Sequence, residues 1–187
     1  MKEKLKHDIA ISFAGEERNI ALCMYLALKL KLPNSRSYYY PEKQSEMIGK
    51  DLKGKLKEIY RHESKYVILI VSKNYVNKEN AFVQAEINAF MPRFLMEKSG
   101  YLIPIIVDNT PIEQVHGELE GITTFKWNYN PEELALEIKK MLGEKEDSST
   151  KAIKKNTSSK DKSEKGINIK RSSFGDVIIG DGSRINK

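Results

Sequence analysis

The sequence predicts an α/β fold, in which a parallel β-sheet carries helices on both faces. Residues 8–142 alternate strand-like apolar runs with segments whose apolar side chains recur at helical spacing. The run 66–71 is apolar at every position, which is typical of a central strand covered on both sides. At 187 residues, 40% of them hydrophobic, the chain is long enough for one such domain.

The first half of this domain is expected to contain two strands. Strand 8–14 ends before Gly15, and Glu16 and Glu17 open a helix because acidic side chains complement its dipole. Pro33 ends that helix. Residues 38–40, three tyrosines with high β-propensity, predict a short strand, and a polar loop follows.

The second half continues the alternation. Apolar side chains at helical spacing predict helices at about 49–61 and 81–97 on either side of strand 66–71, with Pro92 kinking the second helix. Strands follow at 101–107 and 122–127, and the ladder at Pro104 must be one-sided or bulged. Pro131 suits the first turn of a last helix, 131–142.

Composition excludes several classes of function. Cys23 is the single cysteine and the three histidines are scattered, so neither a disulfide nor a metal site is expected. Because no apolar run approaches the ~20 residues that cross a bilayer, we expect a cytoplasmic protein without a membrane segment. Most of the +6 net charge falls beyond residue 142, where acidic residues interrupt the lysines, which argues against nucleic-acid binding.

Three regions are expected along the chain. Residues 1–142 form the folded domain, and 143–165 form a flexible, disordered linker rich in Lys, Ser, Asp and Glu. Residues 166–187 regain apolar side chains between Gly and Asp, which predicts a tail of short β-strands. Two short strands are marginal alone, so this tail is interpreted as a self-association element. The alternative, a disordered basic tail, stays open.

Ligands of open parallel sheets bind beyond the carboxyl ends of the strands, which directs attention to the loops after residues 14, 40 and 72. The turn Phe13-Ala14-Gly15 would let backbone N–H groups approach a phosphate, although it reads equally well as a tight turn. Glu86 has mostly apolar neighbours in sequence, yet Gln84 and Asn88 would also allow a solvated helix face. The tyrosines at 38–40 are interpreted as core residues and the lysines near residue 53 as a solvated face.

The string His7-Asp8-Ile9-Ala10-Ile11-Ser12-Phe13-Ala14-Gly15-Glu16-Glu17 resembles the first box of a Toll/interleukin-1 receptor (TIR) domain. Further similar segments occur in the same order, at Gly49–Leu52, Ser64–Ser72 with Asn74 and Tyr75, and Tyr101–Asp108. Together they cover residues 7–142. The resemblance implies the flavodoxin-like TIR fold, a five-stranded parallel sheet.

Enzymatic bacterial TIR domains carry a W-x-x-x-E motif in the helix after the third strand, and Phe82-Val83-Gln84-Ala85-Glu86 occupies that place. Phe82 replaces the Trp and lacks its indole N–H. The resemblance implies cleavage of the nicotinamide–ribose bond of NAD+ in a bacterial immune or signalling response, with Glu86 catalytic. It further implies that Phe13 and Phe82 contact the nicotinamide and ribose, and that Ala14 and Gly15 take the phosphates. NAD+ is then the substrate, and no cofactor or metal is expected.

Two other interpretations stay open. A non-catalytic TIR module would act as an adaptor through TIR–TIR association, and it would have no need of a carboxylate at residue 86. A flavodoxin-like nucleotide-binding domain of another kind would fit the strand pattern. It lacks the acidic cluster of a phosphoryl receiver, however, because the first strand offers only Asp8, at the wrong end.

Overall fold

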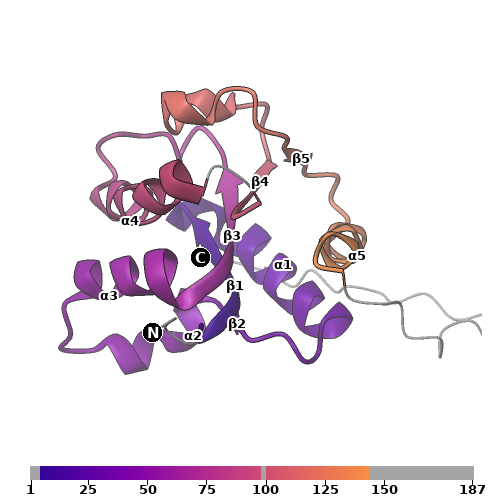
Figure 1. The fold of residues 1–187 in the computed structure, drawn as a ribbon, viewed down its shortest axis with the longest axis horizontal. Helices are drawn as coiled ribbons and strands as arrows, with labels where there is room; N and C mark the ends of the chain where they lie inside the picture. The colour runs from indigo at the N-terminus through magenta and orange to yellow at the C-terminus, as the bar shows by residue number, and fades with distance from the viewer. Residues whose placement is uncertain (1–4, 98–99, 144–187) are drawn as a thin grey trace, which may run out of the picture. The chain divides into compact units, whose positions relative to one another are not determined.

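The computed structural model describes residues 5–97 and 100–143, which contain a five-stranded, entirely parallel sheet in the order β2-β1-β3-β4-β5 (Figure 1). The predicted fold class is therefore confirmed. The strands are β1 (His7–Phe13), β2 (Ser37–Tyr38), β3 (Ser64–Val71), β4 (Leu102–Ile106) and β5 (Phe125–Lys126).

The apolar run 66–71 lies in the central strand, as predicted. β3 pairs with β1 on one side and with β4 on the other, and Val67–Val71 are fully buried. The ladder between β3 and β4 passes through Pro104 without a bulge, while β5 pairs only with Ile105 and Ile106. Pairing at Pro104 is therefore one-sided, because proline has no N–H to give to a second neighbour.

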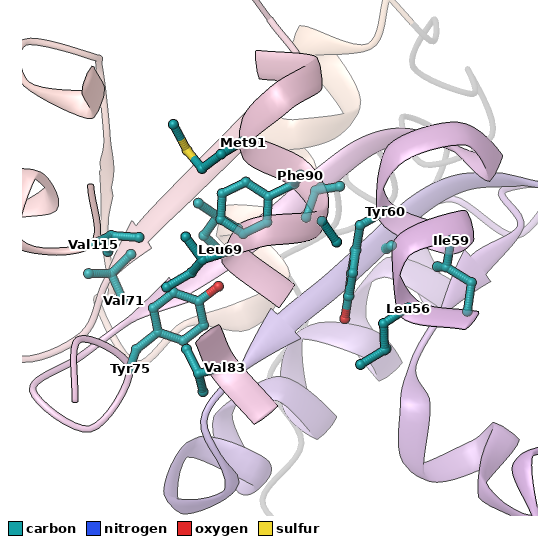
Figure 2. Close-up of a cluster of buried hydrophobic side chains, with 14 of the residues drawn as sticks. Leu56, Ile59, Tyr60, Leu69, Val71, Tyr75, Val83, Phe90, Met91 and Val115 are labelled. Carbon is teal, nitrogen blue, oxygen red and sulfur yellow. The ribbon is translucent and has the colours of Figure 1, made fainter. Parts of the chain in front are cut away.

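Helices cover both faces of the sheet, and alternate residues of β1 and β3 point to opposite sides. Helices α1 and α5 pack on the face that includes Ile9, Ile11 and Phe13. On the other face, α3 and α4 pack over Ala10, Leu69 and their neighbours, which form the cluster of buried side chains in Figure 2. The α-helices are α1 (Arg18–Lys31), α2 (Tyr40–Met47), α3 (Leu52–Glu58), α4 (Ala81–Glu97) and α5 (Pro131–Met141).

Two segments differ from the prediction. The polar loop expected after the tyrosines is largely helix α2, with Pro41 in its first turn, so Tyr40 is helical and the strand before it is shorter than predicted. Proline at this position is pre-organised for helix. The helix expected at about 49–61 begins only at Leu52, and after Glu58 it widens into one π-helical segment, η2 (Ile59–Glu63).

The three tyrosines at 38–40 diverge in the structure. Tyr38 and Tyr39 are buried, on the α4 side and the α1 side of the sheet respectively, which agrees with their interpretation as core residues. Tyr40 is half-buried and contacts Phe82. This contact brings the start of α2 to the start of α4.

The predicted linker 143–165, apart from Gly143, and the predicted tail 166–187 lie outside the described residues. The tail remains a prediction with a direct test. Light scattering on the full chain should give a mass that rises with concentration, while a chain ending at Leu142 should scatter as a smaller species, because short apolar strands bury little surface until several stack. Equal masses for the two chains over a wide concentration range would rule out the tail as an assembly element.

Candidate active site

The carboxyl ends of β1 and β3 lie side by side, and helix α4 crosses the sheet face next to them. Ser12 of β1, Tyr75 of the loop after β3 and Glu86 of α4 meet there. Tyr60 joins them from η2, directly after α3. Figure 2 shows the rings of Tyr60 and Tyr75 within the buried cluster, arriving from different elements.

The carboxyl group of Glu86 is bonded at both oxygens. Ser12 Oγ donates to Oε2 at 2.5 Å, and the Tyr60 hydroxyl donates to Oε1 at 2.7 Å. The Tyr75 hydroxyl lies 2.6 Å from Ser12 Oγ, so with Ser12 donating to the carboxyl group, Tyr75 donates to Ser12. Three hydroxyl groups thus form a chain of hydrogen bonds that fixes the carboxyl group in one orientation.

Glu86 is only 1% exposed, so the interpretation as a solvated side chain is wrong. Burial raises its pKa to about 8, because a buried carboxylate loses its hydration. The hydrogen bonds from Ser12, Tyr60 and the backbone of Phe13 lower the pKa but do not compensate for the burial. The carboxyl group is therefore mainly protonated at neutral pH. Its own O–H can then donate to the Tyr60 oxygen, because the Tyr60 hydroxyl has a second acceptor in the Ile11 carbonyl oxygen at 3.1 Å.

Phe82 lies one helical turn before Glu86, at the start of α4. Asn80 caps this end of the helix, since its Oδ1 accepts hydrogen bonds from the N–H groups of Phe82 and Val83 at 3.2 Å each. The Phe82 ring is half-buried and its centroid lies 5.6 Å from that of Tyr40. One part of an aromatic surface therefore remains open beside the helix start.

The turn after β1 is arranged differently from the expected site. Phe13 points its side chain to the opposite sheet face, where its ring stacks on Tyr39 at 5.6 Å, so the structure does not bring Phe13 and Phe82 together as side chains. Ala14 is fully buried, whereas Gly15 is exposed and begins a short 3-10 helix, η1 (Gly15–Glu17). Only the backbone of Phe13 reaches Glu86.

A hollow of about 460 Å³ lies beside Phe82. It is lined by residues of the loop before α3, of α3 itself and of the first turns of α4: Lys50, Asp51, Leu52, Lys53, Ala81, Phe82 and Ala85. Open space near the candidate site therefore lies on the α3 side of Phe82, while Glu86 itself is covered.

The sequence profile of the TIR domain matches residues 9–140. The chain belongs to the TIR domain family. The match runs from within β1 to within α5 and so includes residues of every strand and helix described, in agreement with the resemblance at 7–142.

One curated relative of this TIR domain is a protein of Aquimarina amphilecti named 3' cyclic ADP-D-ribose synthase AaTIR. The two sequences are 31% identical over 137 residues, which is 73% of this chain and 40% of the relative. This chain therefore corresponds to less than half of the relative's length. The similarity supports the assignment of this chain to the bacterial TIR domain proteins.

Sequence reasoning missed the partners of Glu86. Ser12 is a polar residue on a buried strand, which was a usable signal, since a buried hydroxyl requires a partner. From the sequence, Tyr60 was only part of the helix predicted at about 49–61, and Tyr75 only part of the family resemblance. In this TIR domain they are fully buried, and their hydroxyl groups carry the hydrogen-bond chain.

Within residues 5–97 and 100–143, no three His, Cys, Asp or Glu side chains come close enough together to hold a metal ion. None of the helices in these two ranges has the length and apolar character needed to span a membrane.

Proposed function

We propose that this TIR domain cleaves the bond between nicotinamide and ribose in NAD+. The observation that carries the proposal is the carboxyl group of Glu86, fixed at both oxygens one helical turn after an aromatic side chain, at the edge of the sheet where α/β proteins bind ligands. The relative is named as a synthase of a cyclic ADP-ribose, and this name supports cleavage of the same bond.

The chemistry explains how one carboxylate suffices. The nicotinamide of NAD+ is a pyridinium cation, so the C–N bond breaks with both electrons passing to the ring nitrogen and a neutral leaving group departs. No general acid is required, in contrast to most glycosidases. The remaining ribosyl group is an oxocarbenium-like cation, and a carboxylate held in place near it stabilises the transition state.

Ionisation of Glu86 then depends on the substrate. A cation brought close to a carboxyl group lowers its pKa, so the pyridinium ring favours the ionised form that the empty site disfavours. The hydroxyl groups of Ser12 and Tyr60 lie within hydrogen-bond distance of the two oxygens, and both would donate to the resulting carboxylate. Water completes hydrolysis to ADP-ribose, whereas attack by a hydroxyl group of the ADP-ribose itself gives a cyclic product.

The experiment is incubation of the purified full chain with NAD+ and chromatographic measurement of free nicotinamide. Release above the uncatalysed rate supports the proposal, and the second product shows whether cleavage is hydrolytic or cyclising. Absence of nicotinamide at high protein concentration, where any self-association is favoured, would contradict the proposal.

A second candidate function is supported by the burial of Glu86. A neutral carboxyl group that is 1% exposed and bonded to two hydroxyls is also an adequate structural element of a non-catalytic adaptor. Such an adaptor would act through TIR–TIR association. The nicotinamide measurement separates the two functions, because an adaptor leaves NAD+ intact.

The setting of the enzyme is part of the proposal. NAD+ is an intracellular nucleotide, so we place the activity in the cytoplasm, in a bacterial immune or signalling response. Self-association through the TIR domain and the residues 166–187 would raise the local concentration of the domains and regulate their activity.

Phe82 provides a separate test. Phe82→Ala should raise KM for NAD+ several-fold, because a stacked ring contributes ~1 kcal/mol, while Phe82→Trp should retain activity or increase it. Steady-state kinetics with nicotinamide as readout measure both. Tyr129→Ala, which removes an exposed aromatic ring near α5, is the control and should leave KM unchanged. An unchanged KM for Phe82→Ala would remove Phe82 from the site.

A further inference from the structure

A groove of about 600 Å³ lies between α3 and α4, next to the hollow that contains Phe82. From the sequence, two of its lysines, Lys53 and Lys57, were interpreted as part of a solvated helix face. The groove is lined by residues of three segments, namely α3, the loop before α4 and α4: Lys53, Lys57, Lys78, Glu79, Ala81, Gln84, Ala85, Asn88 and Ala89. Its volume is in the range of sites that hold small organic ligands.

Three ammonium groups border this α3–α4 groove against one carboxylate. Lys53 and Lys57 are four residues apart and so lie on one side of α3, and Lys78 comes from the loop before α4. Among the described residues, these three lysines form no ion pair. By contrast, Lys55, also on α3, pairs with Glu63 at 3.2 Å. Like charges around a hollow repel each other, and an anionic ligand would relieve that repulsion.

The opposite wall of the groove, formed by α4, allows a ligand to come close to the helix. Ala81, Ala85 and Ala89 present only methyl groups along α4, which leaves room for a ligand against the helix. Gln84 and Asn88 add side-chain amides, which donate to and accept from hydroxyl groups. One wall of the groove thus carries lysines, and the other carries small alanine side chains and two amides. This combination fits a ligand that has both phosphates and sugar hydroxyl groups.

The groove also has the right position relative to the candidate site. It shares Lys53, Ala81 and Ala85 with the hollow beside Phe82. At about 100° per residue, Phe82 lies roughly 60° around α4 from Ala85, and Glu86 roughly 40° beyond Phe82. A ligand in the groove could therefore extend along α4 to Phe82, the side chain next to Glu86 around the helix.

We propose that the α3–α4 groove binds the diphosphate of NAD+, with Lys53, Lys57 and Lys78 as its phosphate ligands. This inference rests on the proposed function for the identity of the substrate. It moves the phosphates from the Ala14–Gly15 turn, where Ala14 is fully buried, to a basic groove on the other side of Phe82. Lysine binds phosphate as a compact point charge and requires no planar geometry.

Calorimetric titration of the full chain with ADP-ribose tests the groove without any need for catalysis. We expect Lys53→Gln and Lys57→Gln each to weaken binding about 5- to 10-fold, as for the loss of one charge-assisted hydrogen bond, and the double variant to weaken it further. All of these lysines are exposed, so the fold should not change. Lys126→Gln, an equal loss of charge on β5, is the control and should change the Kd less than 2-fold.

Inorganic pyrophosphate serves as a second probe, since it contains the diphosphate without ribose or base. Lysine-dependent binding of both probes supports the proposal. An ADP-ribose Kd that is unchanged in the double variant, or no binding to the parent chain at millimolar ADP-ribose, would overturn it. So would binding of pyrophosphate with exclusion of ADP-ribose, since a separate anion would then occupy the groove.

Kinetics distinguish this inference from the proposed function. If the parent chain releases nicotinamide, the lysine variants should raise KM for NAD+ with kcat nearly unchanged, and an unchanged KM would overturn the groove assignment alone. If the parent chain binds ADP-ribose through these lysines but releases no nicotinamide, the groove is a nucleotide site and NAD+ cleavage is the part that fails.

Discussion

Replacement of Glu86 by Gln is expected to reduce NAD+ cleavage by about 100- to 1,000-fold with little effect on folding, as for the loss of one electrostatic group that stabilises a transition state. Gln has nearly the same volume, and its amide oxygen still accepts a hydrogen bond from Ser12 or Tyr60. It cannot carry the negative charge that the oxocarbenium-like ribose requires. The loss should therefore appear in kcat, measured as nicotinamide release.

Glu86→Ala removes the same charge but also damages the core. Because Glu86 is buried, Ala leaves a cavity and removes one hydrogen-bond partner each from Ser12 and Tyr60, a loss of about 2–4 kcal/mol of stability. Glu86→Gln is for this reason the sharper variant. Glu120→Gln, an exposed residue in the turn after a 3-10 helix, is the matched control and should retain full activity.

Full turnover of Glu86→Gln under conditions where the parent chain is active would exclude the assigned role. Circular dichroism and the urea midpoint of the variant confirm that the fold is retained. If Glu86→Gln and Glu120→Gln were equally active, the hydrogen-bond chain around residue 86 would be structural, as in the adaptor interpretation.

The sheet could be predicted because its signal is local. A run such as 66–71, apolar on both faces, has no stable position except the middle of a covered sheet, and β3 is found there. Helix α2 has no such signal, since most of its residues are polar and Met47 is the one residue of the helix that is buried. It is tied to the domain by contacts distant in sequence, among them the Tyr25 hydroxyl donating to Glu42.

In the candidate site, too, the features with a local sequence signal could be predicted, and those that depend on distant contacts could not. The spacing of Phe82 and Glu86 is visible in the sequence, but the burial of Glu86 depends on Ser12, 74 residues away, and Tyr60, 26 residues away. The opposite directions of Phe13 and Ser12 follow from the two-residue period of a strand and could have been predicted. Because of this alternation, the Phe13 side chain and Glu86 lie on opposite faces of the sheet.

Stability should fall as the pH rises from 5 to 8, and Glu86 should be the cause. The folded chain keeps a proton on Glu86 up to a pKa of about 8, whereas the unfolded chain loses it near 4.5. Between these values the folded state binds more protons than the unfolded state, so each increase in pH favours unfolding. The contribution is complete below about pH 4.5 and is lost above about pH 8, and we expect a decrease of roughly 2–4 kcal/mol in the free energy of unfolding.

The other described groups with shifted pKa values either titrate outside this pH range or change the stability in the opposite direction. The pKa values of Tyr38, Tyr60 and Tyr75 are raised by burial, so these hydroxyl groups stay neutral throughout this range. Burial lowers the pKa of His7, so that the unfolded state binds the extra proton and stability rises with pH below about 6.5. The His7 contribution is common to the parent chain and to Glu86→Gln, and it cancels in their difference.

Urea unfolding of the parent chain and of Glu86→Gln at several pH values from 5 to 8.5 isolates the contribution of Glu86. The parent chain should lose stability relative to the variant as the pH rises, and above pH 8 the variant should be the more stable of the two, because it buries no charge. Parallel curves would show that the pKa of Glu86 is near its ordinary value in the folded chain. The residue would then be ionised before substrate binds, and the pyridinium ring would have no part in charging it.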